Sequence, residues 1–177
     1  ATTTVFASVG DELAKMAVDR EHRGRGYGYA LLTRAKLHAA RARLAASGLP
    51  AAPILCSDTT VALGRRILGK PADAAQATET LAALSGRTHR VITAVAVAAG
   101  RREWLAVSTS RVHFDAMPPR EIERYVASGE PFGKAGAYAI QSAVAAWIAR
   151  IEGSYSGIMG LPLFETAQLL RQAGVRF

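Results

Sequence analysis

The sequence predicts an α/β fold in which a mixed sheet is flanked by helices. Helical and extended patterns alternate irregularly along the 177 residues, which favours a mixed architecture over an all-helical or all-strand one. Residues 91–99 form a continuous apolar run, as in a strand that is buried on both faces. Half of the residues are hydrophobic and a fifth are charged, a balance typical of a globular chain with a sizeable core.

The first predicted element is a helix over residues 31–46. This segment has strong helix formers and contains neither proline nor glycine. Leu37, Ala40 and Leu44 fall on one helical stripe, which indicates the face that packs on the core. Gly48 then ends the helix.

A short strand over residues 54–56 is expected next, followed by a hairpin that pairs residues 61–63 with residues 67–68. Asp73 is placed to cap a helix whose third position is Gln76. The remaining expected elements are strands over 91–99 and 104–114, a short helix after Pro118, strands over 137–140 and 145–151, and a last helix opened by Pro162 with Leu163, Thr166 and Leu170 on one side.

Composition limits the classes of function. No apolar run approaches the roughly 20 residues that would span a bilayer, and the first residues lack the pattern of a secretory signal, so we expect a cytoplasmic protein without membrane contact. The single cysteine, Cys56, lies in an apolar run and is expected to be a small buried hydrophobe. The net charge of +8 is compatible with a solvated basic face or with binding of an anion.

Two residues are candidates for chemistry on position alone. Asp58 follows the strand expected over residues 54–56, where a carboxylate can hold a divalent cation or take a proton from water; a carboxylate bonded to its own turn is equally compatible. Lys70 lies between Gly69 and Pro71, where it can neutralise a phosphate, although most such lysines are merely exposed.

A series of short motifs occurs in a specific order and resembles the Maf family of nucleotide pyrophosphatases over about four fifths of the chain, from about Thr33 onwards. The series consists of Thr33-Arg34-Ala35-Lys36, Ser57-Asp58-Thr59, Ile67-Leu68-Gly69-Lys70-Pro71, Leu84-Ser85-Gly86-Arg87-Thr88-His89, Tyr125-Val126-Ala127-Ser128-Gly129-Glu130-Pro131, Lys134-Ala135-Gly136-Ala137-Tyr138, Ile140-Gln141 and Gly153-Ser154-Tyr155-Ser156.

The resemblance implies a fold of two lobes around a nucleotide-binding cleft. It implies hydrolysis of a nucleoside triphosphate between the α and β phosphates, with a divalent cation, Mg²⁺ or Mn²⁺. Asp58 would be the proton acceptor and a metal ligand, and Lys36 and Lys70 would neutralise phosphates. Thr59 and Gln141 would bind substrate and set preference, with glutamine typical of the branch that prefers dTTP and UTP. A homodimer is a further expectation from the family.

Within one domain over 1–177, residues 1–32 depart from the family pattern. The family carries a Ser-x-Ser-Pro-Arg-Arg turn near its start, whereas this chain has no Pro-Arg-Arg there. An inactive member that binds nucleotide or nucleic acid is therefore one alternative, although no specific nucleic-acid partner is expected. The other alternative is an acyl-CoA binder, because Arg23, Gly26 and Gly28 resemble the pyrophosphate loop of GCN5-related N-acetyltransferases.

Overall fold

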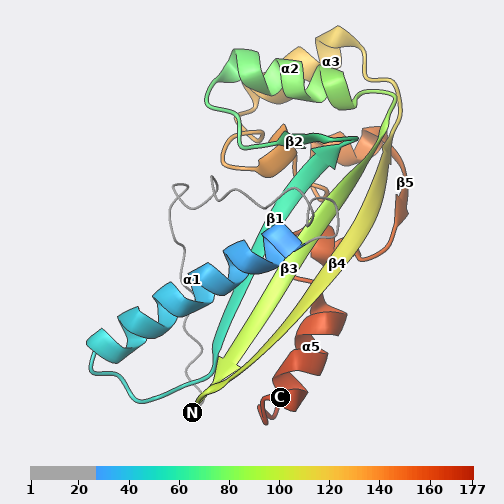
Figure 1. The fold of residues 1–177 in the computed structure, drawn as a ribbon. Helices are drawn as coiled ribbons and strands as arrows, with labels where there is room; N and C mark the ends of the chain where they lie inside the picture. Colours follow the sequence, from blue (N-terminus) through green and yellow to red (C-terminus); the bar gives the residue numbers. More distant parts are fainter. Residues whose placement is uncertain (1–26) are drawn as a thin grey trace. The chain divides into compact units, whose positions relative to one another are not determined.

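The computed structural model describes residues 27–177 (Figure 1). Most of the segment that departs from the family pattern lies outside the described residues. The same is true of Arg23 and Gly26 of the acetyltransferase-like loop, whereas Gly28 belongs to the first helix. No helix among residues 27–177 is long and apolar enough to cross a membrane.

Within residues 27–177, five strands form one sheet in the order β2-β1-β3-β4-β5. The strands β1 and β2 pair antiparallel, as do β4 and β5. The strands are β1 (Ile54–Leu63), β2 (Arg66–Leu68), β3 (Thr88–Ala99), β4 (Arg102–Phe114) and β5 (Ile148–Glu152). The helices are α1 (Tyr27–Ala46), α2 (Ala74–Leu84), α3 (Pro119–Ala127), α4 (Tyr155–Ile158) and α5 (Leu163–Gln172), with short 3₁₀ segments η3 (Ala135–Ala137) and η4 (Ala143–Trp147).

The chain folds as two compact units, which agrees with the two lobes that the sequence predicts. The first unit contains the described residues up to Asp58, together with Thr93–Ser108 and Leu161–Phe177. The second contains Thr59–Ile92 and Thr109–Gly160. Each unit has a hydrophobic core of its own, and the chain passes between the units within β1, β3 and β4.

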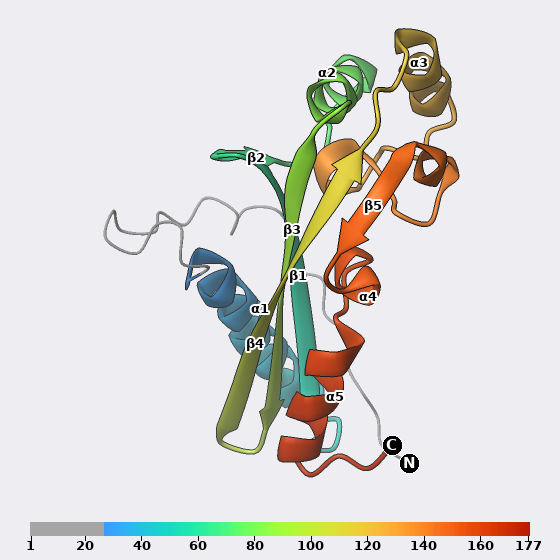
Figure 2. The ribbon, with the colours of Figure 1, turned by 90° about the vertical axis from the view of Figure 1, so that its right-hand side faces the viewer.

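In the first unit, the helices α1 and α5 cover opposite faces of the strands (Figure 2). Ile54 and Cys56 of β1 pack with Leu37 of α1 on one face. Leu55 packs with Leu169 of α5 on the other face, as the two-residue period of a strand requires. This double cover explains why residues 91–99 of β3 are apolar without alternation, and it confirms the expectation of a strand buried on both faces.

In the second unit, α2 and α3 pack together beside the strands (Figure 1). Leu81 and Leu84 of α2 join Phe114 of β4 and Val126 of α3 in one buried cluster. The α2 helix begins where the sequence predicts, because the Asp73 carboxylate accepts a hydrogen bond from the backbone N–H of Gln76.

Two predicted strands need correction. No strand forms over residues 137–140, because Ala137 has φ 60° and is preceded by Gly136 at φ 76°, both outside the β region. Residues 145–147, expected in a strand, belong instead to η4, and the strand β5 begins only at Ile148. Residues 137–140 are nevertheless buried, so the apolar run marks a core segment with a different backbone conformation.

The last helix, α5, forms as predicted, but its buried face differs from the predicted stripe. Leu163 is 60% exposed, whereas Thr166 and Leu169 are buried and Leu170 is half-buried. Leu163 lies in the first turn after Pro162, where the chain enters the helix, so its position on the stripe does not guarantee contact with the core.

Candidate functional site

Asp58 lies inside the strand β1 rather than beyond its end. The sequence predicted a strand that stops at residue 56, but β1 continues to Leu63 and includes the polar run Ser57 to Thr60. By the period of the strand, Asp58 faces the same side as Ile54 and Cys56, which is the side covered by α1. Neither a position beyond the strand end nor a turn explains this carboxylate.

Lys36 on α1 reaches Asp58, and the lysine Nζ donates a hydrogen bond to the carboxylate Oδ1. The two side chains are only 18% and 17% exposed, so each charge needs the other to offset the loss of water. Lys36 lies beside β1 because the next residue, Leu37, is fully buried in the core between α1 and the strands, which holds this turn of α1 against the sheet. The structure thus joins two residues that the family pattern singles out.

Cys56 lies two residues before Asp58 on the same face of β1 and is 4% exposed. Burial raises the pKa of its thiol, and the positive charge of Lys36 only partly opposes this effect. A thiol with a raised pKa is a poor nucleophile at neutral pH. The expectation that Cys56 is a small buried hydrophobe is confirmed.

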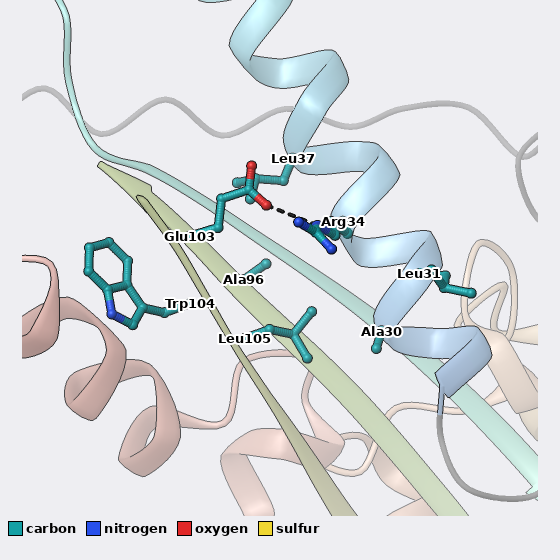
Figure 3. A pocket seen from close by; sticks show the side chains of 8 residues that line it. All are labelled: Ala30, Leu31, Arg34, Leu37, Ala96, Glu103, Trp104 and Leu105. Carbon is teal, nitrogen blue, oxygen red and sulfur yellow. Dashed lines mark hydrogen bonds and ion pairs between the residues drawn. The ribbon is translucent and has the colours of Figure 1, made fainter. Parts of the chain in front are cut away.

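Part of the positive charge on α1 is engaged in a cluster around Glu103 of β4, of which Figure 3 draws the pair with Arg34. Arg34 Nε lies 2.9 Å and Arg41 Nη1 2.6 Å from the Glu103 carboxylate, and His38 Nε2 lies 3.1 Å away. Burial acts to raise the pKa of Glu103, but Arg34 and His38 outweigh it and the pKa is lowered. No local pattern in the sequence predicts this cluster, because it joins residues of α1 and β4 that are more than 60 positions apart.

A cavity of about 370 Å³ lies beside this cluster, between α1 and β4 (Figure 3). Its walls are mainly apolar, and the charged groups that line it, Arg34 and Glu103, are paired with each other. Its lining residues are Ala30, Leu31, Arg34, Leu37, Ala96, Glu103, Trp104 and Leu105. Lys36 and Asp58 are not among them.

The second unit carries the other three predicted site residues. Thr59 follows Asp58 in β1 and lies close to Gly160. Lys70 is exposed in the loop after β2, and the carbonyl of Gly69 before it accepts a 3.0 Å hydrogen bond from the Gly136 N–H. This bond joins the Gly-Lys-Pro loop to the glycine-rich segment after α3, so two of the predicted motifs are in contact.

Close packing explains why position 136 is a glycine. Its φ is 76°, and a Cβ there would lie 2.9 Å from a Val61 methyl group. A larger residue would be strained at this φ and would force either this segment or the Val61 side chain to shift.

Gln141 is exposed on a tight turn from Ala139 to Ser142. The Ser142 N–H donates to the Ala139 carbonyl at 3.0 Å, and Ile140, the other central residue, is buried. The turn therefore anchors itself in the core through one side chain and presents the next to solvent.

His89 of the Leu84-to-His89 motif is a core residue. It is 1% exposed, and its Nε2 lies 2.7 Å from the hydroxyl of Tyr138. Burial lowers the pKa of His89 to about 4, so the imidazole is neutral at pH 7. The pair fixes Tyr138, which follows the Lys134-to-Ala137 segment, against the strands of the second unit.

Lys36 and Asp58 are thus in contact, Thr59 is adjacent to Asp58 along β1, and Lys70 and Gln141 belong to the second unit. That all five line one cleft stays a prediction. Among residues 27–177, no group of three or more histidine, cysteine, aspartate or glutamate side chains is arranged to hold a metal ion.

Comparison with known proteins agrees with the motif series. The family model described as Maf-like protein matches residues 5–173, so the match includes most of the segment before Thr33. A Polaromonas protein named dTTP/UTP pyrophosphatase is 66% identical over 145 residues, which are 82% of this chain and 72% of that protein. Proteins of the same name from Albidiferax ferrireducens (61% over 145 residues, 82% and 72% of the two chains) and Cupriavidus metallidurans (63% over 142, 80% and 71%) are also similar.

Proposed function

This chain belongs to the Maf family, and we propose that it hydrolyses dTTP and UTP to the nucleoside monophosphate and pyrophosphate. The observation that carries the proposal is its identity of 61–66% to proteins named dTTP/UTP pyrophosphatase, over about four fifths of its length. The aligned length includes Lys36, Asp58, Thr59, Lys70 and Gln141, because any stretch of at least 142 of the 177 residues contains residues 36–142.

The ion pair of Lys36 and Asp58 suggests how the two groups would act. When a triphosphate enters, its oxygens compete with Asp58 for the Lys36 ammonium. Asp58 would then be released to orient the attacking water and accept its proton. Attack at the α phosphorus breaks the bond to the β phosphate, the pyrophosphate leaves with the electron pair, and the proton from water goes to the Asp58 carboxylate.

The second unit would supply groups for binding. Lys70 is exposed on a loop held by Gly136 and would neutralise the phosphates that leave. Thr59 would contact the substrate beside Asp58, and Gln141 would contact the base. A primary amide has both donor and acceptor atoms, which matches the N3–H and O4 of thymine and uracil.

We further propose that Mg²⁺ or Mn²⁺ is required. Asp58 is the carboxylate that would hold the ion, with phosphate oxygens completing the shell, an arrangement that suits a hard cation bound together with nucleotide. When bound, the cation would neutralise phosphate charge and polarise the reacting phosphate. A cytoplasmic homodimer also stays a proposal, which cell fractionation and light scattering would test.

A panel of nucleoside triphosphates tests the function. The purified chain is incubated with each nucleotide and Mg²⁺ or Mn²⁺, and pyrophosphate and orthophosphate are measured separately. We expect pyrophosphate from dTTP and UTP, less from the other nucleotides, and none in excess chelator. Absence of pyrophosphate with every nucleotide would contradict the proposal, and consumption of acetyl-CoA instead would favour the acetyltransferase alternative.

A further inference from the structure

We propose that the hydroxyl groups of Tyr125 and Ser142 form a clamp that positions Gln141 and thereby tunes the preference for thymine and uracil nucleotides. The inference rests on the proposed function and assigns Tyr125 and Ser142 a positioning role within it. All of the groups concerned belong to the second unit.

The clamp closes the base of the turn that carries Gln141. Tyr125 Oη lies 2.8 Å from Ser142 Oγ and 3.3 Å from the backbone nitrogen of Ala139. Ser142 Oγ lies 2.9 Å from the Ala139 carbonyl oxygen. Two side-chain hydroxyls thus bridge the first and last residues of the turn, in addition to its own backbone hydrogen bond.

The hydrogen bonds among Ala139, Tyr125 and Ser142 can form a closed ring in which each group donates to the next. The Ala139 N–H can only donate, so it donates to Tyr125 Oη, and the Ala139 carbonyl can only accept, so Ser142 O–H donates to it. The Tyr125 O–H can then donate to Ser142 Oγ and complete the ring, and the Glu130 carboxylate beside it is a second acceptor for the same proton. Burial is the main cause that raises the pKa of Tyr125, so its hydroxyl keeps the proton that this arrangement needs.

The clamp is fixed to the core on both sides of Gln141. Tyr125 is 6% exposed on α3, and Ile140 within the turn is 4% exposed. Tyr138, just before the turn, is held by His89 at 2.7 Å. The backbone of the turn is therefore held by buried groups, while the Gln141 side chain alone is exposed.

Such a support matters for recognition of a base. Thymine and cytosine present opposite patterns of donor and acceptor at positions 3 and 4, and a primary amide that is free to move can adapt to either. An amide carried by a rigid turn loses less freedom on binding and is held in one place relative to the base. Loosening the turn should therefore affect dTTP more than dCTP.

The test compares the effect of Ser142→Ala as a single substitution with its effect in a protein that also carries Gln141→Ala. The readout is the ratio of kcat/KM for dTTP to kcat/KM for dCTP. We expect Ser142→Ala to lower this ratio about threefold to tenfold, mainly through a higher KM for dTTP, as loss of one or two neutral hydrogen bonds implies. In the Gln141→Ala background, the same change should leave the ratio unaltered, because the clamp acts through Gln141.

Ser85→Ala is the matched control, since Ser85 Oγ is also partly buried and bridges two backbone groups of Met117 in the same unit. It should leave the ratio unchanged. Tyr125→Phe should reproduce Ser142→Ala, with circular dichroism to confirm folding. The clamp would be overturned if either Ser142→Ala or Gln141→Ala left the dTTP-to-dCTP ratio of kcat/KM unchanged. It would also be overturned if Ser142→Ala lowered this ratio equally with and without Gln141→Ala. None of these results would contradict the proposed hydrolysis of dTTP and UTP. No hydrolysis by the unmutated chain would overturn the proposed function itself, and the clamp with it.

Discussion

Replacing Asp58 by asparagine tests the residue on which the proposed chemistry most depends. The change keeps the size of the side chain and a carbonyl oxygen that can still accept a hydrogen bond from Lys36. It removes the negative charge and the ability to accept a proton. Hydrolysis should therefore fall while the fold persists.

The magnitudes follow from the surroundings of the ion pair. General-base catalysis contributes about 10²–10⁴-fold, so we expect the rate to fall by at least about 10²-fold. Breaking a fully buried pair costs about 3–5 kcal/mol. The side chains of Asp58 and Lys36 are still 17% and 18% exposed, and asparagine can still accept a hydrogen bond from the lysine. We therefore expect a smaller loss, about 1–2 kcal/mol in unfolding free energy. A domain of ordinary stability, about 5–15 kcal/mol, remains folded after such a loss.

The assay is pyrophosphate release from dTTP, with urea unfolding followed by circular dichroism as the measure of stability. Asp115→Asn is the matched control, because Asp115 is exposed in a loop and its carboxylate accepts a local hydrogen bond from the Ala116 N–H, while its backbone bonds to Gly86 and Trp147 are untouched by the change. The control should keep both rate and stability. A folded Asp58→Asn protein that is nearly as fast as its parent would remove Asp58 from the catalytic role.

Three further predictions concern other residues. Lys70→Ala should raise the KM for dTTP severalfold with a smaller effect on kcat, measured by steady-state kinetics; an unchanged KM would contradict a role in binding. Asp73→Ala removes the cap of α2 and should lower the unfolding free energy by about 1 kcal/mol in urea, with activity retained. The pKa of His89 is about 4 in the folded state and about 6.5 when unfolded, so the unfolded chain binds more protons between these values. The contribution of neutral His89 to the unfolding free energy is therefore complete above pH 6.5 and should be lost as the pH falls towards 4. Measured by urea unfolding, the free energy of unfolding of His89→Gln should fall less over this pH range than that of the unmutated protein.

Local signals in the sequence predicted α1, α2, α3 and α5 but not the short helix α4. The run of helix formers before Gly48, and Asp73 with Gln76, mark real helix boundaries because capping and propensity act over a few residues. The hairpin of β1 and β2 was predicted for the same reason and is confirmed.

Features that depend on distant contacts were harder to predict. Asp58 lies within β1 because the strand continues through the polar run from Ser57 to Thr60, which no local pattern in the sequence shows. The extended strand expected over 137–140 is absent because Gly136 packs against Val61, 75 positions earlier, in a conformation that no strand adopts.

The candidate site was predicted from the ordered motifs rather than from physical pattern. The spacing of residues alone did not distinguish whether Asp58 is a site carboxylate or a turn residue. It also did not predict that Lys36 contacts Asp58. The Glu103 cluster and the clamp of Tyr125 and Ser142 join residues whose separate positions in the sequence carry no signal of contact. Only the packing of α1 against β4, and of α3 against the turn that carries Gln141, brings these residues into contact.

The position of bond cleavage in dTTP is the most direct measurement of the central claim. The purified chain is incubated with dTTP and Mg²⁺, and the nucleotide and phosphate products are separated and quantified over time. The proposal predicts dTMP and pyrophosphate in equal amounts, with no dTDP. Release of dTDP and orthophosphate, or recovery of unchanged dTTP, would contradict it.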